Sequence, residues 1–360
     1  MTRREFLRTA GTLAVTAAVP ALRLQAAELK PATASHLPRW RGFNLTEKCV
    51  KQKEGKNPPF RENDFATVAE WGFDFARLPL SYLCWTDPDD WLKVLEAELK
   101  DLDAAVELGS KHAVHVNLNL HRAPGYCVNP PKEPLDLWTD ENALGACAFH
   151  WGMLAKRFRG IDNNHLSFDL LNEPANISEE KYARVVKRLV QAIRAEDSQR
   201  LIIADGLRWG REPVQDLVEL GIAQSTRGYD PMQVSHYQAS WVRGADAWAE
   251  PTWPLTLKDK AAIDKEKLRK ERIVPWQQLE KKGVGVHVGE WGAFSRTPHT
   301  VVLAWMRDCL ELWKEAGWGW ALWNLRGDFG VLDSHRADVD YEEFRGHKLD
   351  RQMLQLIQGG

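Results

Sequence analysis

Strand-like apolar runs alternate with helix-like stretches along nearly the whole chain, and this alternation constrains the fold more than any other feature. The strand-like runs span residues 40–45, 74–80, 112–121, 165–173, 200–206, 232–238, 284–292 and 319–327. The helix-like stretches span residues 62–71, 91–109, 141–158, 179–195, 213–220, 265–282, 299–316 and 347–357. Strands that alternate with helices of this length pair in parallel through right-handed crossovers. The pattern therefore predicts an α/β fold, a single-domain (β/α)8 TIM barrel.

An open, doubly wound sheet is the alternative arrangement of the same elements. It is disfavoured because no G-x-G-x-x-G motif or P-loop follows any of the strands. No low-complexity linker interrupts the chain, so we expect one domain over residues 28–360. The two longest irregular insertions, 123–140 and 239–262, both follow a strand. In a barrel both lie at the C-terminal face, where active sites are found.

The first 27 residues have the features of a targeting segment. The stretch TRREFLR (Thr2–Arg8) resembles a bacterial twin-arginine export signal, and the apolar run behind it ends near Ala26 or Ala27. This run is too short and too weakly apolar for a membrane-spanning helix. We expect residues 1–27 to be a signal peptide and the mature protein to be periplasmic or secreted.

Composition excludes several classes of function. The formal net charge of −2 gives no support for binding to nucleic acid or to an anionic membrane. The five cysteines are scattered and form no C-x-x-C motif, so a metal site is not expected. The chain has 17 Trp, whose flat apolar rings suit either a core or the face of a sugar. We expect a monomer without metal or cofactor.

Polar side chains gather where the predicted strands give way to loops. In strand order, these ends carry Arg77, His121, Asn172 with Glu173, His236 with Tyr237, Glu290 and Trp323. The ends of parallel strands in a barrel meet on one rim, and ionisable groups are costly to bury without partners. A cluster of this kind indicates a functional site.

The third strand shows which face such residues occupy. His115, Asn117, Asn119 and His121 alternate with apolar residues. Helices cover the outside of a barrel, so the polar series is expected to point inward. His112 and His115 are three positions apart and lie on opposite faces, which excludes them as a zinc pair.

Two carboxylic acids, Glu173 and Glu290, end the fourth and seventh strands. Hydrolysis of a glycosidic bond requires two carboxyl groups that flank it, one protonated and one ionised. Arg77 is suited to keep one of them ionised, and Tyr237 to orient it. Spacing alone leaves open which carboxyl attacks and whether configuration is retained. A strict period of two does not turn both acids inward, which points to a local bulge.

Seven short stretches follow one another along residues 39–327 in a recognisable order: RGFNL, GFDFARLPLSY, NLNLHRAPG, FDLLNEP, VSHYQ, GEWG and ALWNL. Together they resemble glycoside hydrolase family 5, the cellulase-type retaining β-glycosidases. NEP on the fourth strand combined with GEWG on the seventh is the most specific part of the match.

The resemblance implies that Glu173 is the general acid/base and Glu290 the nucleophile of a double displacement with retention. In such enzymes the two carboxyl groups lie about 5–5.5 Å apart. Arg77 and Tyr237 would hold the nucleophile, and Asn172 would bond the sugar 2-hydroxyl. By the same resemblance the site is completed by His121, His236 and Trp323.

The expected substrate is a β-glucan-type polysaccharide or oligosaccharide, cleaved in the manner of an endoglucanase. An exo-β-1,3-glucanase, which LHRAPG also resembles, and a β-mannanase are the alternatives within the family. A non-catalytic carbohydrate-binding barrel is the alternative from another class, but both candidate acids are present. Candidate stacking platforms for the sugar are Trp85, Trp138, Trp209, Trp241, Trp248 and Trp253.

Overall fold

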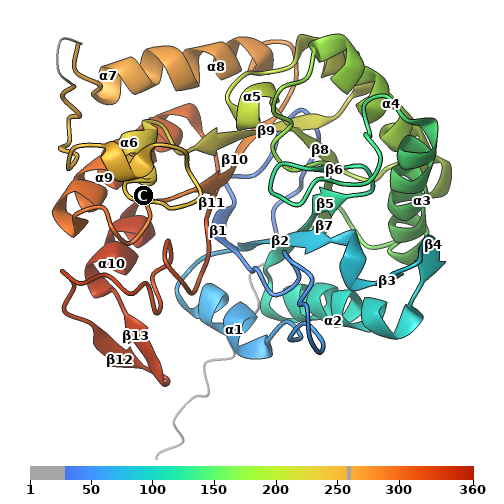
Figure 1. Ribbon diagram of the computed structural model, residues 1–360, viewed down its shortest axis with the longest axis horizontal. Coiled ribbons are helices and arrows are strands. Elements are labelled where there is room, and N and C mark those ends of the chain that lie inside the picture. Colours follow the sequence, from blue (N-terminus) through green and yellow to red (C-terminus); the bar gives the residue numbers. More distant parts are fainter. Residues whose placement is uncertain (1–28, 258–260) are drawn as a thin grey trace, which may run out of the picture.

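Eight parallel strands close into a barrel in the computed structural model, which describes residues 29–257 and 261–360 (Figure 1). The strands are β1 (Arg41–Asn44), β2 (Phe75–Ser81), β5 (His115–Ala123), β7 (Leu166–Asp169), β8 (Ile202–Asp205), β9 (Ala223–Gly228), β10 (Val286–Trp291) and β11 (Trp320–Leu322). They pair in the order β2-β1-β11-β10-β9-β8-β7-β5, and pairing of β2 with β5 closes the ring. The predicted TIM barrel is confirmed. The predicted signal peptide, residues 1–27, lies outside the described residues.

Helices surround the barrel and cover the outward faces of its strands (Figure 1). They are α1 (Glu62–Glu70), α2 (Glu96–His112), α3 (Glu141–Arg157), α4 (Glu179–Glu196), α7 (Lys265–Leu268), α8 (Val274–Glu280), α9 (His299–Ala316) and α10 (Arg351–Gly359). A π-helical segment, Arg269–Ile273, joins α7 to α8, and a 3-10 helix, Gln215–Leu220, stands between β8 and β9. In α4 the Ser178 side chain caps the first turn, and apolar residues at helical spacing from Tyr182 to Ile193 are buried.

Smaller elements decorate the loops. Two hairpins pair β3 (Thr86–Asp87) with β4 (Asp90–Val94) and β12 (Glu342–Phe344) with β13 (His347–Leu349). Strand β6 (Tyr126–Cys127) folds back antiparallel on the end of β5. The short helices are α5 (Leu207–Gly210) and α6 (Met232–Ser235), with 3-10 turns at Tyr82–Cys84 and Ala245–Ala247.

The barrel interior changes character from one end to the other. At the N-terminal end, His115 stacks between aromatic rings, 3.8 Å from the Trp40 centroid and 5.5 Å from that of Phe75. His287 packs on Phe75 at 4.6 Å. Burial lowers the pKa of His115 to about 3, so this layer is uncharged at neutral pH. Towards the C-terminal end the inward residues become polar and charged, as the alternation in the third strand predicts.

One predicted strand is wrong. The sixth barrel strand is β9 (Ala223–Gly228), whereas the predicted run at 232–238 contains the short helix α6. The β9 sequence AQSTRG has no apolar run because its inward side chains, Ser225 and Arg227, meet the polar part of the barrel. The other seven predicted strands coincide with barrel strands, within a few residues at their ends.

No helix in the described ranges is long and apolar enough to cross a membrane. All five cysteines lie within these ranges, and none is paired in a disulfide.

Close approach of neighbouring strands makes Gly42 in β1 a sensitive position. A Cβ atom there would lie 1.7 Å from the carbonyl oxygen of Phe75, a backbone atom of β2 that cannot move away alone. We expect Gly42→Ala to lower the free energy of unfolding by about 3 kcal/mol or more, at the upper end for an overpacked core. Gly145→Ala is the matched control, because a Cβ on that exposed face of α3 meets no atom within 4 Å. It should raise stability by about 0.5–1 kcal/mol. Urea denaturation measures both, and equal effects would contradict this account.

Candidate active site

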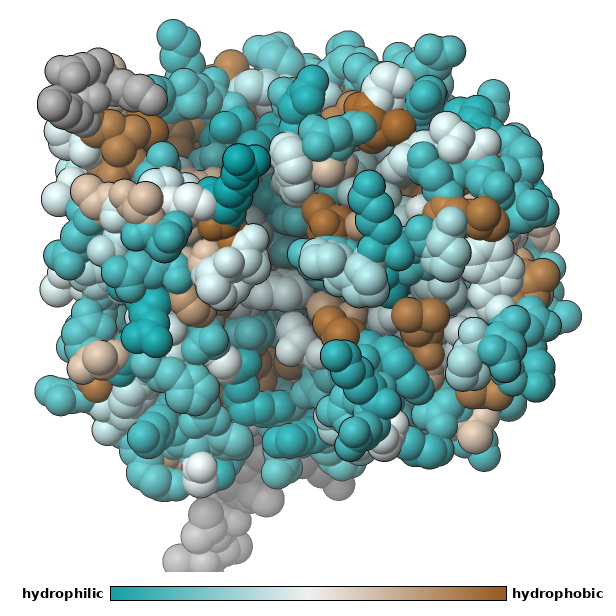
Figure 2. All heavy atoms as spheres, in the orientation of Figure 1, coloured by the Kyte–Doolittle hydropathy of each residue, from teal (hydrophilic) through white to brown (hydrophobic). Residues whose placement is uncertain are grey.

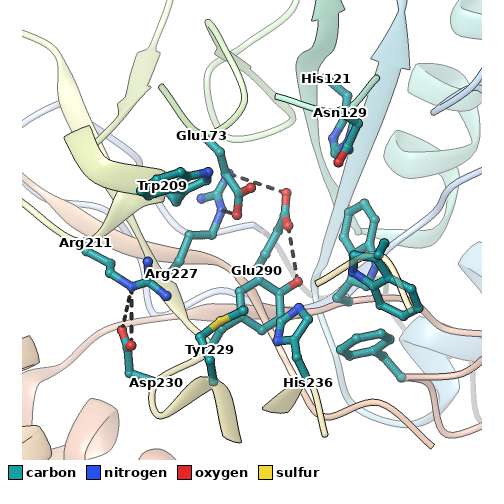
Figure 3. Close-up of a pocket in the computed structure, with 14 residues that line it drawn as sticks. His121, Asn129, Glu173, Trp209, Arg211, Arg227, Tyr229, Asp230, His236 and Glu290 are labelled. Carbon is teal, nitrogen blue, oxygen red and sulfur yellow. Dashed lines mark hydrogen bonds and ion pairs between the residues drawn. The ribbon is translucent and has the colours of Figure 1, made fainter. Parts of the chain in front are cut away.

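A cavity of about 500 Å³ opens at the C-terminal mouth of the barrel, in the hollow visible in Figure 2. This volume is in the range of small-molecule sites. Of the predicted site residues, those that line it are His121, Glu173, His236, Glu290 and Trp323. Its other lining residues are Asn129, Trp209, Arg211, Arg227, Tyr229, Asp230, Met232, Trp241 and Phe329 (Figure 3).

A bulge in β10 turns Glu290 into this cavity. Val288 pairs with Thr226 of β9, but Glu290 pairs with the next residue, Arg227, so Gly289 is the extra residue. The bulge shifts the alternation by one position, and Glu290 points inward instead of outward with Val288. The bulge inferred from the sequence is confirmed.

Three donors engage the carboxylate of Glu290, whose side chain is only 4% exposed. The Nη1 of Arg77 donates to Oε1 at 2.6 Å, and the Nη2 of Arg227 lies 3.4 Å from the same oxygen. The hydroxyl of Tyr229 donates to Oε2 at 3.2 Å. Two guanidinium groups and a hydroxyl donor therefore surround this buried carboxyl, in charge-assisted contacts.

Glu173 lies four residues beyond the end of β7 in a left-handed backbone conformation, with φ of 51°. Two hydrogen bonds hold this conformation, which residues other than glycine adopt rarely. The backbone N–H donates to Oδ2 of Asp205 at 2.8 Å, and the backbone carbonyl accepts from the hydroxyl of Tyr126 at 2.7 Å. The dipeptide Glu173–Pro174 does not by itself predict a left-handed conformation at Glu173.

The electrostatic environment of Glu173 differs from that of Glu290. Burial and then repulsion from Glu290 raise the pKa of Glu173 to about 8, although Arg227 acts in the opposite direction. Its Oε1 lies 3.4 Å from Nε of Arg227, and the side chain is 16% exposed. At neutral pH Glu173 therefore keeps its proton. The cavity thus contains one carboxyl that holds a proton and one that is surrounded by cationic donors.

Asn172 is locked between the two arginines. Its Oδ1 accepts from Nη2 of Arg77 at 2.9 Å and from Nη2 of Arg227 at 3.0 Å. Because a guanidinium can only donate, these bonds fix which end of the amide is the oxygen. The Nδ2 of Asn172 is buried without a partner in the described structure. It is a hydrogen-bond donor that no described residue satisfies.

Two acidic residues of this cluster, Asp169 and Asp205, were missed by the sequence analysis. Asp169 accepts from Nε of Arg77 at 2.9 Å, and Asp205 accepts from Nη1 of Arg227 at 2.9 Å. Burial, followed by the charge of Asp205, raises the pKa of Asp169 to about 7. An Asp closing a buried strand, as in SFD and IIAD, was the available signal.

His121 and Trp323 form another wall of the cavity. Their rings stack with centroids 5.6 Å apart at 20°. The Nε2 of His121 lies 3.3 Å from the Asn129 amide nitrogen, which can only donate, so Nε2 accepts. Burial and then the charge of Arg77 lower the pKa of His121 to about 3, so the ring is neutral. Trp323 directly follows β11, as predicted.

The predicted placement of His236 and Tyr237 at a strand end is wrong, because both follow the short helix α6. His236 still lines the cavity, with Nδ1 2.8 Å from Oγ of Ser235, and burial lowers its pKa to about 4. The hydroxyl of Tyr237 instead accepts from the Gln238 amide at 3.1 Å. The tyrosine that contacts Glu290 is Tyr229, one residue after β9.

Two of the six candidate tryptophan platforms line the cavity, Trp209 and Trp241. Trp241 is 58% exposed and packs edge-on against Phe294 at 4.8 Å. The other four candidates, which are not among the lining residues, are Trp85, Trp138, Trp248 and Trp253. No group of His, Cys, Asp or Glu side chains suited to hold a metal ion occurs among the residues described.

Comparison with known proteins decides the family. A model described as Cellulase (glycosyl hydrolase family 5) matches residues 32–328. The chain belongs to glycosyl hydrolase family 5. It is therefore an O-glycosyl hydrolase, and the expected family resemblance is confirmed.

Individual relatives of this family 5 hydrolase agree with that assignment. A crystal structure of a glycoside hydrolase is 38% identical, with a TM-score of 0.85 over 89% of this chain and 99% of that one. Endoglucanase C from Acetivibrio thermocellus is 26% identical over 84% of this chain and 95% of its own. Endoglucanase Cel5A from Thermotoga maritima, 22% identical over 88% of this chain and 96% of its own, shares the fold with a TM-score of 0.71.

The contact of Tyr229 with Glu290 gives a test of the corrected site. We expect Tyr229→Phe to lower the kcat of the hydrolase about 10-fold or more, since a hydrogen bond to a charged group contributes about 1.5–3 kcal/mol. Tyr237→Phe is the matched control and should leave kcat near the wild-type value. Steady-state kinetics on a soluble β-glucan measures both. A larger loss in Tyr237→Phe would restore the assignment made from the sequence.

Proposed function

We propose that this family 5 hydrolase cleaves β-linked glucans by double displacement with retention, with Glu173 as general acid/base and Glu290 as nucleophile. The observation that carries the proposal is the contrast between the two carboxyls of one cavity. Glu173 is protonated at neutral pH, while Glu290 is bonded by Arg77, Arg227 and Tyr229. Pairs of carboxyls with opposite proton preferences are what this reaction requires.

In the first step the Glu173 proton passes to the glycosidic oxygen as its bond to the anomeric carbon breaks. A carboxylate oxygen of Glu290 forms a bond to the same carbon, giving a glycosyl ester and releasing the shortened sugar. In the second step Glu173, now ionised, takes a proton from water, whose oxygen attacks the anomeric carbon. The ester bond breaks, Glu290 recovers its charge, and Glu173 its proton. Two inversions at one carbon leave the configuration retained.

Several other residues in or beside the cavity suit the binding of a sugar at the reacting position. The buried Nδ2 of Asn172 offers a donor beside Glu173 for the 2-hydroxyl. The neutral ring of His121 offers polar atoms to other hydroxyls, and the Trp323 ring a flat apolar face. His236 contributes a further neutral imidazole.

The proposed substrate is a β-glucan polysaccharide or oligosaccharide, cut internally as by an endoglucanase. Support comes from relatives of that description and from Trp209 and the exposed Trp241, which both line the cavity. We further propose that the twin-arginine stretch Thr2–Arg8 directs export of a monomeric enzyme. Cell fractionation and gel filtration of the full chain test these two points.

Substitution of either carboxyl tests the mechanism. We expect Glu173→Gln to lower kcat/KM on β-glucan by about 10²–10⁴-fold, the range for general acid/base catalysis. Glu290→Gln should lose at least as much, because no ester can form. The control is Glu212→Gln, an exposed residue whose side chain pairs with Arg208 at 3.4 Å. Activity is measured on a panel of β-1,4-, mixed-linkage and β-1,3-glucans and mannan, with circular dichroism to verify folding.

Analysis of product lengths from the same panel separates internal cleavage from release of end units. Near wild-type turnover by Glu290→Gln would refute the double displacement. Release of single sugars from β-1,3-glucan alone would support the exo-acting alternative.

The raised pKa of Glu173 predicts a basic limb in the pH profile. Activity needs protonated Glu173, so kcat/KM should fall as the pH rises through about 8, where this proton is lost. The free enzyme's pKa governs this parameter, which is measured on a soluble substrate under subsaturating conditions. A basic limb near the ordinary pKa of a glutamic acid, about 4.3, would contradict the assigned role.

A further inference from the structure

The guanidinium of Arg227 contacts both of the proposed catalytic carboxyls (Figure 3). It comes from the end of β9, the strand that the sequence analysis misplaced. Its Nε is 3.4 Å from Oε1 of Glu173, and its Nη2 is 3.4 Å from Oε1 of Glu290. The Arg227 side chain is only 2% exposed. A single buried cation therefore contacts both carboxyls at once.

Asp205, at the end of β8, holds this cation in place. Its carboxylate accepts from both Nη atoms of Arg227, one bond being 2.9 Å, in the two-pronged geometry that fixes a guanidinium best. Asp205 is fully buried, and its Oδ2 also accepts the backbone N–H of Glu173 at 2.8 Å. One residue thus fixes the position of Arg227 and of Glu173.

Two glycines leave room for the side chain of Arg227. A Cβ at Gly289, the bulge residue of β10, would lie 2.7 Å from Nη1 of Arg227. A Cβ at Gly210 would lie 2.6 Å from its Cγ. The space for the Arg227 side chain therefore exists because these two residues have no side chain.

We propose that Arg227 and Asp205 are a positioning pair that sets when Glu173 holds and releases its proton. This inference rests on the roles proposed for Glu173 and Glu290. The positive charge of Arg227 favours the ionised form of Glu173. The negative charge of Asp205 opposes part of this effect. Removal of either member therefore changes the proton affinity of Glu173 in the opposite direction from removal of the other.

The pair also couples Glu173 to the state of Glu290. When Glu290 carries negative charge it repels charge on Glu173 and shares the cation of Arg227. When Glu290 becomes an ester it is neutral, so Arg227 then favours ionised Glu173, the form that the second step needs as a base. The arrangement supplies an acid and then a base from one side chain.

Several other charged or titratable groups face Glu173 and act in the same field. They are Glu290 on β10, Arg77 on β2, Tyr126 on β6 and Tyr229 after β9. Asp169 on β7 acts on the two guanidinium groups. The two guanidinium groups, Arg77 and Arg227, neutralise two of the four carboxyls. Asp169 contacts Arg77 rather than Arg227, so its ionisation does not replace the charge of Asp205.

Titration of Glu173 itself tests the pair. The full chain is labelled with carboxyl-¹³C glutamate, and the Glu173 resonance is assigned by its loss in Glu173→Gln. We expect Arg227→Met to raise the pKa of Glu173 by about one unit or more and Asp205→Asn to lower it, since an opposite charge at this range contributes about 1–3 units. Arg227→Lys keeps the charge and should shift the pKa less than Arg227→Met. In each active variant the basic limb of kcat/KM should move with the titration.

Arg211→Met is the matched control, because Arg211 lines the same cavity but pairs with Asp230 at 3.1 Å. It should leave the Glu173 titration unchanged. Shifts of the same sign in Arg227→Met and Asp205→Asn, or no shift in either, would overturn the proposal. If Arg227→Met does not fold, the direction in Asp205→Asn decides, and an unchanged or raised pKa overturns it. Failure of the wild-type enzyme to cleave any β-glucan would refute the proposed function, while the titration still tests the pair.

Discussion

Two buried guanidinium groups hold the mouth of this barrel together. Arg77 and Arg227 contact four carboxyls and two amides, which come from β1, β7, β8 and β10 or the ends of these strands. Buried charges are costly unless they are paired and hydrogen-bonded, so none of these groups is independent of the others. With four acids and two cations, the cluster approaches neutrality when two of the acids, Glu173 and Asp169, retain protons, in agreement with their raised pKa values. Proton retention by Glu173 is thus a property of the whole cluster.

Much of the fold and the site was predictable because it depends on local sequence. Alternating strands and helices gave the barrel, and Glu173, Glu290, His121 and Trp323 all line its cavity. The bulge at Gly289 could be inferred only indirectly. A strict alternation of side chains along the strand turns Glu290 outward, which conflicts with a place in the site.

The sixth strand was not predictable from apolar content. The β9 residues that point inward meet the charged mouth of the barrel instead of an apolar core, so the β9 sequence resembles a loop. The stretch VSHYQ was therefore predicted as the sixth strand, although it overlaps the helix α6. That single error hid Arg227 and Tyr229 together. It also hid the paired hydrogen bonds between Asp205 and Arg227. The role of an acidic residue such as Asp205 can be inferred only when its basic partner is known. Apolar periodicity along one strand carries no information about contacts with strands that are distant in the sequence.

The stacked rings at the opposite end of the barrel have a consequence for the chemistry. Trp40, Phe75, His115 and His287 pack against one another and are buried, so they form an apolar floor beneath the charged cluster. Solvent approaches the carboxyls from the mouth. A sugar seated there displaces that water and leaves the carboxyls between the floor and the ligand, in surroundings of lower dielectric constant. The substrate itself then strengthens the electrostatic interactions that act on it.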